Sequence, residues 1–243
     1  MNNKNIPLTD RLIFALDVPT ADEAKAWVEK LESQINFYKV GLQLFLAGGF
    51  PMVEWLTKRG HKVMLDLKFF DVPETVKLAV RQLNDRGITF ATVHGNDAII
   101  EAAVEARQDI KILGVTVLTS FCEDDLRQMG LTGSIEELVY YRAKKALELG
   151  CDGIVSSGLE AGRLRGQLGD NFLVVTPGIR PGINQEMEQD DQKRITTARQ
   201  AIQAGADYVV VGRPIKRAVD PLEVVTELQA EITAGLDTPS RLS

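Results

Sequence analysis

The chain of 243 residues is long enough for one large α/β domain or two small ones, and a domain of this size buries about 70 to 75% of its unfolded surface. The formal net charge is −6, and the basic residues form no stripe, which argues against nucleic acid or an anionic membrane as the main partner. The sequence contains no apolar run of about 18 residues and does not begin with a signal-peptide pattern, so we expect a soluble protein of the cytoplasm.

Short runs rich in β-branched residues alternate with helical patterns along the chain. Eight runs predict strands, at residues 11–18, 37–41, 61–69, 90–95, 111–119, 153–158, 172–179 and 208–215. Between the strands, apolar residues recur at helical spacing, as at Ala24, Val28 and Leu31. Glycines shortly before the next strand mark the ends of several helices, at Gly60, Gly87, Gly150 and Gly205.

Eight strand–helix units in a chain of this length predict a closed (β/α)8 TIM barrel, a single domain spanning residues 1–243. Parallel strands need helical crossovers, and closure of the sheet leaves no exposed edge. The alternative is an open, doubly wound sheet. It is disfavoured because LDVPTADEA, rather than a GxGxxG turn, follows the first strand.

The third predicted strand carries charges where a buried strand normally has Val, Ile or Leu, since residues 61–76 read HKVMLDLKFFDVPETV. Asp66 and Lys68 are two residues apart, so both side chains point to one face, and Asp71 follows in the turn. Asp17 and Lys39 end the first two strands. The carboxyl ends of barrel strands meet at one mouth, so we expect these charges to converge there. The alternative is a solvated charge cluster of little functional weight.

The histidines give little support for a metal site. The chain has two of them, without HxH or HExxH spacing, and we interpret His94 as a hydrogen-bonded structural residue at a strand end. Carboxylates alone could hold Mg²⁺, but we expect no required metal.

The last two strands carry a second candidate site. TPGIR and VVVGRPI place glycine amides and the arginines Arg180 and Arg213 where barrel enzymes usually bind phosphate. The polar stretch PGINQEMEQDDQ follows Arg180 and is longer than an ordinary connection, so we expect a mobile lid at about residues 180–193. A surface insertion without function is the alternative.

Together these motifs resemble the bacterial-type orotidine 5'-monophosphate decarboxylase family, which catalyses the last step of UMP synthesis without a cofactor. The resemblance spans about residues 10 to 232 and rests on FALDVPT, YKVGLQLF, DLKFFDVPETV, TPGIRP and VVGRPI, in the family order and spacing. DxKxxD alone is shared with sugar-phosphate enzymes of the same suprafamily, whereas its combination with Lys39 on the second strand is specific.

The resemblance implies a role for each charge at the predicted mouth. Asp17 would bind the ribose, and Lys39 would contact the ribose and the catalytic network. Asp66, Lys68 and Asp71 would complete an alternating Lys/Asp array, in which Lys68 stabilises and protonates the carbanion at C6 of the substrate.

The resemblance also implies substrate contacts and a homodimer. Family members place the equivalents of Asp71 and Thr75 in the partner's site. The remaining substrate contacts would be Thr119, with Ser120 nearby, at the pyrimidine, Arg180, Gly212 and Arg213 at the phosphate, and Gln192 at the phosphate and base.

Two other functions remain open from the sequence. A sister enzyme, such as a 3-keto-gulonate-phosphate decarboxylase or a hexulose-phosphate synthase, would use Mg²⁺ and an acidic residue near the second strand, where this chain has Lys39. A non-catalytic nucleotide-binding barrel is the alternative from a different class, and the complete Lys/Asp set argues against it.

Overall fold

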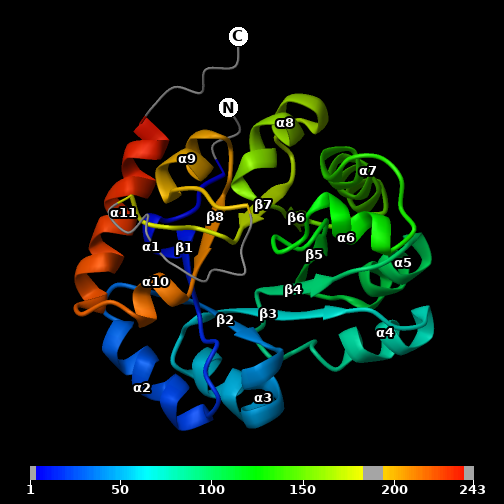
Figure 1. The fold of residues 1–243 in the computed structure, drawn as a ribbon. Coiled ribbons are helices and arrows are strands. Elements are labelled where there is room, and N and C mark those ends of the chain that lie inside the picture. Colours follow the sequence, from blue (N-terminus) through cyan, green and yellow to red (C-terminus); the bar gives the residue numbers. More distant parts are fainter. Residues whose placement is uncertain (1–3, 183–193, 238–243) are drawn as a thin grey trace.

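The computed structural model describes residues 4–182 and 194–237, and in this part of the chain eight parallel strands form a closed barrel (Figure 1). Each strand pairs with the next one in sequence, and the last pairs back with the first. The strands are β1 (Leu12–Ala15), β2 (Phe37–Gly41), β3 (Lys62–Phe69), β4 (Phe90–Val93), β5 (Lys111–Val115), β6 (Gly153–Val155), β7 (Leu173–Thr176) and β8 (Tyr208–Val211). The predicted (β/α)8 barrel is confirmed, and the open doubly wound sheet is wrong.

Helices follow every strand and surround the barrel. They are α1 (Leu8–Arg11), α2 (Ala21–Leu31), α3 (Leu42–Lys58), α4 (Pro73–Arg81), α5 (Asp97–Ala106), α6 (Glu123–Gln128), α7 (Ile135–Glu148), α8 (Gly158–Leu168), α9 (Ala198–Gln203), α10 (Arg213–Lys216) and α11 (Pro221–Asp237). None of the helices in the described ranges is both long and apolar enough to cross a membrane. The location in the cell stays a prediction.

The strands divide the core into two apolar layers. Side chains such as Leu12 and Phe14 of β1 point outwards and pack under the helices. Side chains of the alternate parity, such as Ile13 and Ala15, point into the barrel. The period of two therefore decides which residues of each strand can reach the barrel interior and its mouth.

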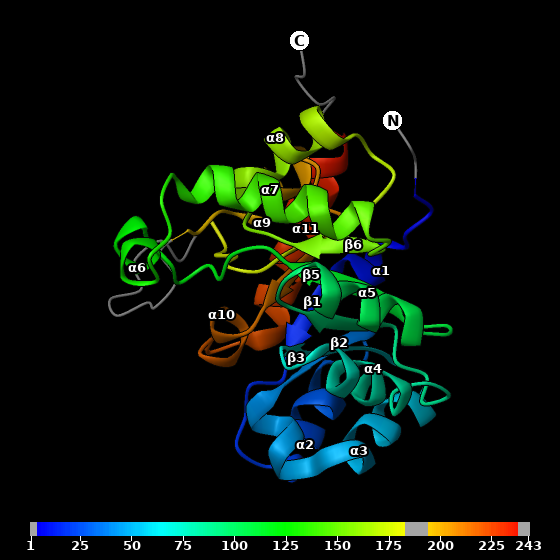
Figure 2. The ribbon, with the colours of Figure 1, turned by 90° about the vertical axis from the view of Figure 1, so that its right-hand side faces the viewer.

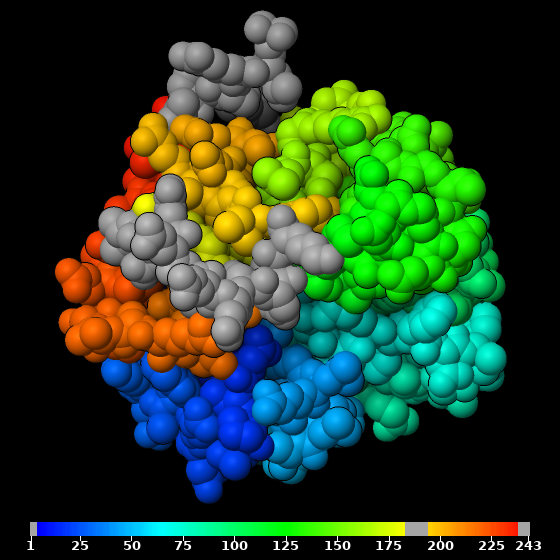
Figure 3. Space-filling view, viewed as in Figure 1, coloured from blue at the N-terminus to red at the C-terminus, as the bar shows by residue number. Residues whose placement is uncertain are grey.

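The barrel interior is closed at the amino ends of the strands. Phe37, Phe90 and Tyr208 form a layer there, with ring centroids 5.2 to 5.8 Å apart. Figure 2 shows α1 at this end of the barrel and α6 and α10 at the other. In the described part of the chain this aromatic layer leaves the carboxyl ends of the strands as the open end of the barrel, which is the face seen in Figures 1 and 3.

Several predicted strands extend too far at their carboxyl ends. The strand predicted at 208–215 ends at Val211, and α10 begins at Arg213 with Pro214 in its first turn, where proline favours a helix. The strand predicted at 111–119 ends at Val115. After Val115 the apolar residues Val117 and Leu118 continue the run into the barrel mouth, so apolar patterning alone could not mark that strand end.

Candidate active site

Strand parity brings the predicted charges to the mouth of the barrel. Lys39 is two residues after the inward-facing Phe37, and Asp66 is two residues after the inward-facing Met64. Asp17 continues the inward parity of Ile13 and Ala15 past the end of β1. The charged residues thus occupy the layer above the apolar filling of the barrel.

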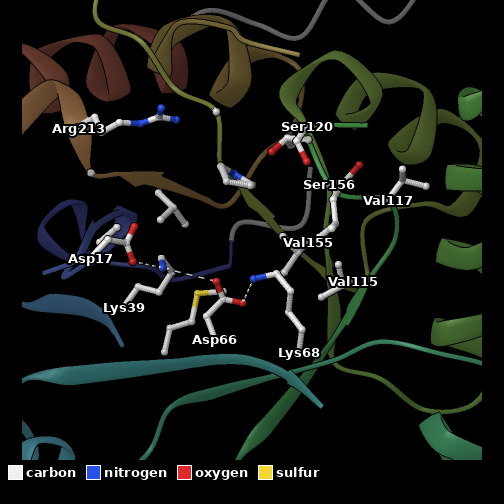
Figure 4. Close-up of a pocket in the computed structure, with 18 of the residues that line it drawn as sticks. Asp17, Lys39, Asp66, Lys68, Val115, Val117, Ser120, Val155, Ser156 and Arg213 are labelled. Atoms are coloured by element: carbon white, nitrogen blue, oxygen red, sulfur yellow. Dashed lines mark hydrogen bonds and ion pairs between the residues drawn. The ribbon is translucent and has the colours of Figure 1, made fainter. Parts of the chain in front are cut away.

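Four of these side chains form a continuous chain of ion pairs across β1, β2 and β3 (Figure 4). The Nζ of Lys39 lies 2.9 Å from Oδ1 of Asp17 and 3.6 Å from Oδ2 of Asp66. The Nζ of Lys68 lies 2.9 Å from Oδ1 of Asp66. The side chains of Lys39 and Asp66 are only 12% and 11% exposed, so the centre of the array is not a solvated surface cluster.

Lys68 reaches the mouth through an irregular backbone rather than simple alternation. Its φ of 49° lies in the left-handed region, and the pairing of β3 with β4 shifts register between Leu65 and Phe69. Thr92 of β4 holds this backbone, because its Oγ1 accepts from the N–H of Lys68 at 2.9 Å and donates to Asp66 at 2.9 Å. Such a conformation costs about 1 to 3 kcal/mol in a non-glycine residue and is common at functional sites.

The array keeps its two innermost members charged. Burial alone raises the pKa of Asp66, but Lys39 and Lys68 outweigh it and hold that pKa below its ordinary value. Burial likewise lowers the pKa of Lys39, but Asp66 and Asp17 outweigh it and hold that pKa above its ordinary value. The site therefore combines a buried carboxylate with ammonium groups on both sides of it.

We expect Asp66→Asn to lower the free energy of unfolding at pH 7 by about 3 to 5 kcal/mol, because two buried or half-buried ammonium groups lose their shared counter-charge. The pKa of Asp66 is lowered in the folded state, so its contribution is complete above the unfolded pKa of about 3.9 and is lost as the pH falls through the folded value. The stability difference between wild type and variant should therefore shrink by about 1.4 kcal/mol per pH unit below about pH 4.

Urea unfolding between pH 3 and pH 8 measures this difference. Asp109→Asn, at an exposed carboxylate on a loop, is the matched control and should show no comparable change. A stability difference for Asp66→Asn that stays constant down to pH 3 would contradict the assignment of Asp66 as a buried carboxylate with a lowered pKa.

The charge of Lys39 affects stability at the alkaline end. Its contribution to the free energy of unfolding is complete below its unfolded pKa and is lost as the pH rises through its raised folded pKa.

The sequence-based prediction missed two residues that support the array. Thr92 shares the inward parity of Phe90, which is the signal that could have identified it. Gly41 leaves room for the ion pair beside it, because a Cβ there would lie 3.1 Å from Nζ of Lys39 and 3.2 Å from Oδ1 of Asp17. Any side chain at Gly41 would have to displace that pair.

A cavity of about 270 Å³ lies over the array at the mouth of the barrel. Val115, Val117 and Val155 provide an apolar wall, and Thr119 and Ser120 follow β5 at its edge. Figure 4 shows Ser120 on the side of the cavity opposite Asp17. This side of the cavity therefore offers apolar contacts next to hydroxyl groups.

The predicted phosphate residues lie on another side of the same cavity. Arg180, Gly212 and Arg213 line it, and Figure 4 shows Arg213 well separated from Lys68. Lys216 of α10 donates to the backbone carbonyl of Asp17, which fastens this short helix to the loop after β1. Gln192 and most of the predicted lid at 180–193 lie outside the described residues, so those predictions stay untested.

Asp71 and Thr75 do not line the cavity of their own chain. Both are exposed, and the carboxylate of Asp71 accepts from the N–H of Val72 at 2.7 Å. Within the described residues no ion pair joins Asp71 to Lys68, so its predicted approach to that lysine stays a prediction.

His94 also lies beside rather than in the cavity. Its Nδ1 is 3.1 Å from the carbonyl oxygen of Val115, and burial lowers its pKa, which fits a neutral structural histidine. No group of three His, Cys, Asp or Glu side chains in the described ranges is arranged to hold a metal. The expected independence of a metal remains a prediction.

Comparison with known proteins gives consistent matches along nearly the whole chain. The family model described as "Orotidine 5'-phosphate decarboxylase / HUMPS family" matches residues 10–228. The protein named orotidine 5'-phosphate decarboxylase from Methylococcus capsulatus is 54% identical over 233 residues, which is 96% of each chain. Its namesake from Rhodopseudomonas palustris is 49% identical over 92% of this chain and 94% of its own. The crystal structure of orotidine 5'-phosphate decarboxylase from Lactobacillus acidophilus is 35% identical, with a TM-score of 0.80 over 93% of this chain and all of its own.

Proposed function

The chain belongs to the orotidine 5'-phosphate decarboxylase / HUMPS family, and from this premise we propose that it decarboxylates orotidine 5'-monophosphate to UMP in pyrimidine biosynthesis. The family match alone does not choose among the reactions of the family. The relatives cited here are named for this reaction, and the ion-pair chain Asp17–Lys39–Asp66–Lys68 at the barrel mouth is the observation that carries the proposal.

The substrate would span the cavity from the array to the arginines. Its 5'-phosphate would lie against Arg180, the amide of Gly212 and Arg213, because guanidinium groups and glycine amides can approach an anion closely. Asp17, which is 51% exposed, would accept hydrogen bonds from the ribose hydroxyls while it holds Lys39.

The pyrimidine would then lie between the array and the wall after β5. Thr119 and Ser120 offer hydroxyl groups to the rim of the base, and the valines of the same wall cover its face. This orientation directs C6 and its carboxylate towards Lys68, which is supported by the position of that lysine at the side of the cavity away from Arg213.

Cleavage of the bond between C6 and the carboxylate releases CO2 and leaves the electron pair on C6, in the plane of the ring. No π-system can delocalise that pair, so a localised positive charge is needed to stabilise it. The ammonium of Lys68 is fixed by Asp66 at 2.9 Å and supplies this charge before the reaction begins. Lys68 then gives its proton to C6, forms UMP and recovers a proton from solvent.

The second part of the proposal is a homodimer that completes the array. Asp71 and Thr75 are exposed, and the two chain neighbours of Asp71 are the exposed apolar residues Phe70 (67%) and Val72 (62%). Exposed apolar patches mark interaction surfaces, and a twofold interface here would bring Asp71 of each chain to the mouth of the other.

We expect purified protein to convert orotidine 5'-monophosphate to UMP at the same rate with and without excess EDTA. None of the steps above needs a metal, because Lys68 supplies both the charge and the proton. The loss of orotate absorbance measures the rate, and chromatography identifies UMP as the product.

The other outcomes separate the alternatives. Conversion that stops in EDTA would contradict the metal-free mechanism. Conversion only of sugar phosphates with Mg²⁺ would assign the chain to a sister reaction. Binding of UMP by a folded protein that turns over neither class of substrate would support the non-catalytic barrel.

A further inference from the structure

Arg194 does not line the cavity, but it hydrogen-bonds to the backbone of the segment between β5 and α6. Nη2 of Arg194 donates to the carbonyl oxygens of Val117 at 3.0 Å and Leu118 at 2.9 Å. The next two residues are Thr119 and Ser120, the hydroxyl-bearing edge of the wall. The position of these hydroxyls in the cavity therefore depends on a guanidinium group outside it.

The same guanidinium also reaches the neighbouring wall, at the end of β6. Nη1 of Arg194 pairs with Oε1 of Glu160, whose other carboxylate oxygen accepts from the hydroxyl of Ser156 at 3.2 Å. Ser156 lines the cavity and is 1% exposed. The side chains of Arg194 and Glu160 are 11% and 9% exposed, so the pair is shielded from solvent and holds its geometry better than a surface ion pair.

We propose that Arg194 is a positioning residue for base recognition. It joins residues 117–120, which follow β5, to Ser156, which follows β6, and sets the distance between these two sides of the cavity. This inference rests on the proposed function, because the pyrimidine is the group that function assigns to these walls. Arg194 acts through Val117, Leu118 and Glu160 and makes no contact of its own with the cavity.

The chemistry of the guanidinium group explains why an arginine is needed. Its planar fork carries donors in fixed directions, so one group can serve two adjacent carbonyls on one side and a carboxylate on the other. A lysine ammonium at the same place can pair with Glu160 but lacks the reach to satisfy all three acceptors at once. A methionine fills a similar volume and leaves the buried carbonyls and the carboxylate without a donor.

A second arginine supports the same segment independently. Nη1 of Arg142, on α7, donates to the carbonyl oxygen of Thr116 at 2.8 Å. The hydroxyl of Thr116 also bonds to Val155 of β6, at 2.9 Å. We therefore expect the start of the segment to stay fixed when Arg194 is changed. The displacement should be confined to residues 117–120, which would contact the pyrimidine base.

The test compares one ligand that carries the base with one that lacks it. Affinities for UMP and for ribose 5-phosphate are measured by calorimetry in wild type, Arg194→Met, Arg194→Lys and the control Arg199→Met, at an exposed arginine of α9. We expect Arg194→Met to weaken UMP about tenfold or more, and ribose 5-phosphate less than about twofold. Arg194→Lys should lie between, and Arg199→Met should match wild type with both ligands.

The ratio of the two affinities decides the matter. Equal weakening of both ligands, or no weakening of UMP, in Arg194→Met overturns the proposal, because a general loss of structure would not single out the base. If Arg194→Met does not fold, the ratio in Arg194→Lys is decisive in the same way. Wild-type protein that binds neither UMP nor orotidine 5'-monophosphate contradicts the proposed function itself, whereas wild-type binding with an unchanged ratio in the variants contradicts only this inference.

Discussion

Lys68→Ala is expected to lower the turnover of orotidine 5'-monophosphate by at least about 10⁵-fold while UMP binding stays measurable. A unit charge about 4 Å from the carbanion is worth about 4 kcal/mol at an effective dielectric constant of about 20, or about 10³ in rate. Loss of the proton donor removes a further factor of about 10² to 10⁴. UMP has no carboxylate at C6, and the contacts proposed for its phosphate and ribose do not involve Lys68.

Single-turnover assays with excess enzyme measure the residual rate, and calorimetry measures UMP binding. Lys58→Ala, at a lysine side chain that is 80% exposed on α3, is the matched control and should keep the wild-type rate. The φ of 49° at position 68 suits alanine no better than lysine, so the substitution does not relieve the backbone. A Lys68→Ala rate near that of wild type would exclude Lys68 as the source of the charge and the proton.

The period-two pattern made the convergence of Asp17, Lys39 and Asp66 at the barrel mouth predictable. Phe37 and Lys39 share one face of β2, and Met64 and Asp66 share one face of β3. Because the apolar member of each pair faces the barrel interior, the charged member is predicted to face the barrel mouth. Closure of the barrel then brings Asp17 of β1 to the same place. The parity of each strand and the order of the strands in a (β/α)8 barrel can both be predicted from the sequence, so the meeting of these charges can be predicted too.

Other features depend on contacts between distant parts of the chain. The left-handed backbone of Lys68 follows from a register shift against β4, and spacing within β3 cannot reveal it. The hydrogen bonds of Thr92 to that residue are likewise visible only once the two strands are paired. Arg194 pairs with Glu160, 34 positions away in sequence, and Glu160 accepts a hydrogen bond from Ser156, 4 positions away. No sequence motif marks this series of contacts.

The buried charges also bear on stability. Asp66 is 9% exposed, and apolar residues of the same volume at such positions are often as stable or more stable than an ion pair. The strained backbone of Lys68 adds a further cost. Stability alone would favour apolar residues in place of the whole array, so the proposed stabilisation of a charged transition state explains best why the barrel mouth contains it.

Asp71→Asn and Lys68→Ala are expected to complement each other in a mixed dimer. If Asp71 acts in the partner's site, a dimer of one Lys68→Ala chain and one Asp71→Asn chain has one site with both residues intact and one site with neither. Such a dimer should show about half of the wild-type activity, although each variant alone is nearly inactive. Two different affinity tags on co-expressed chains allow the mixed dimer to be purified, and the absorbance assay measures its rate.

The mixed dimer also tests the alternative in which Asp71 folds back onto Lys68 of its own chain. In that case each chain of the mixed dimer has one defect in its own site, and the activity stays at the level of the separate variants. Asp71 is exposed, and its carboxylate bonds to the N–H of Val72 rather than to Lys68, which favours the first outcome. A mixed dimer of Lys68→Ala with Lys58→Ala provides the reference for a single intact site, because the second substitution lies on an exposed side chain away from the array. Activity equal to that reference would place Asp71 in the partner's site and make the dimer the catalytic unit.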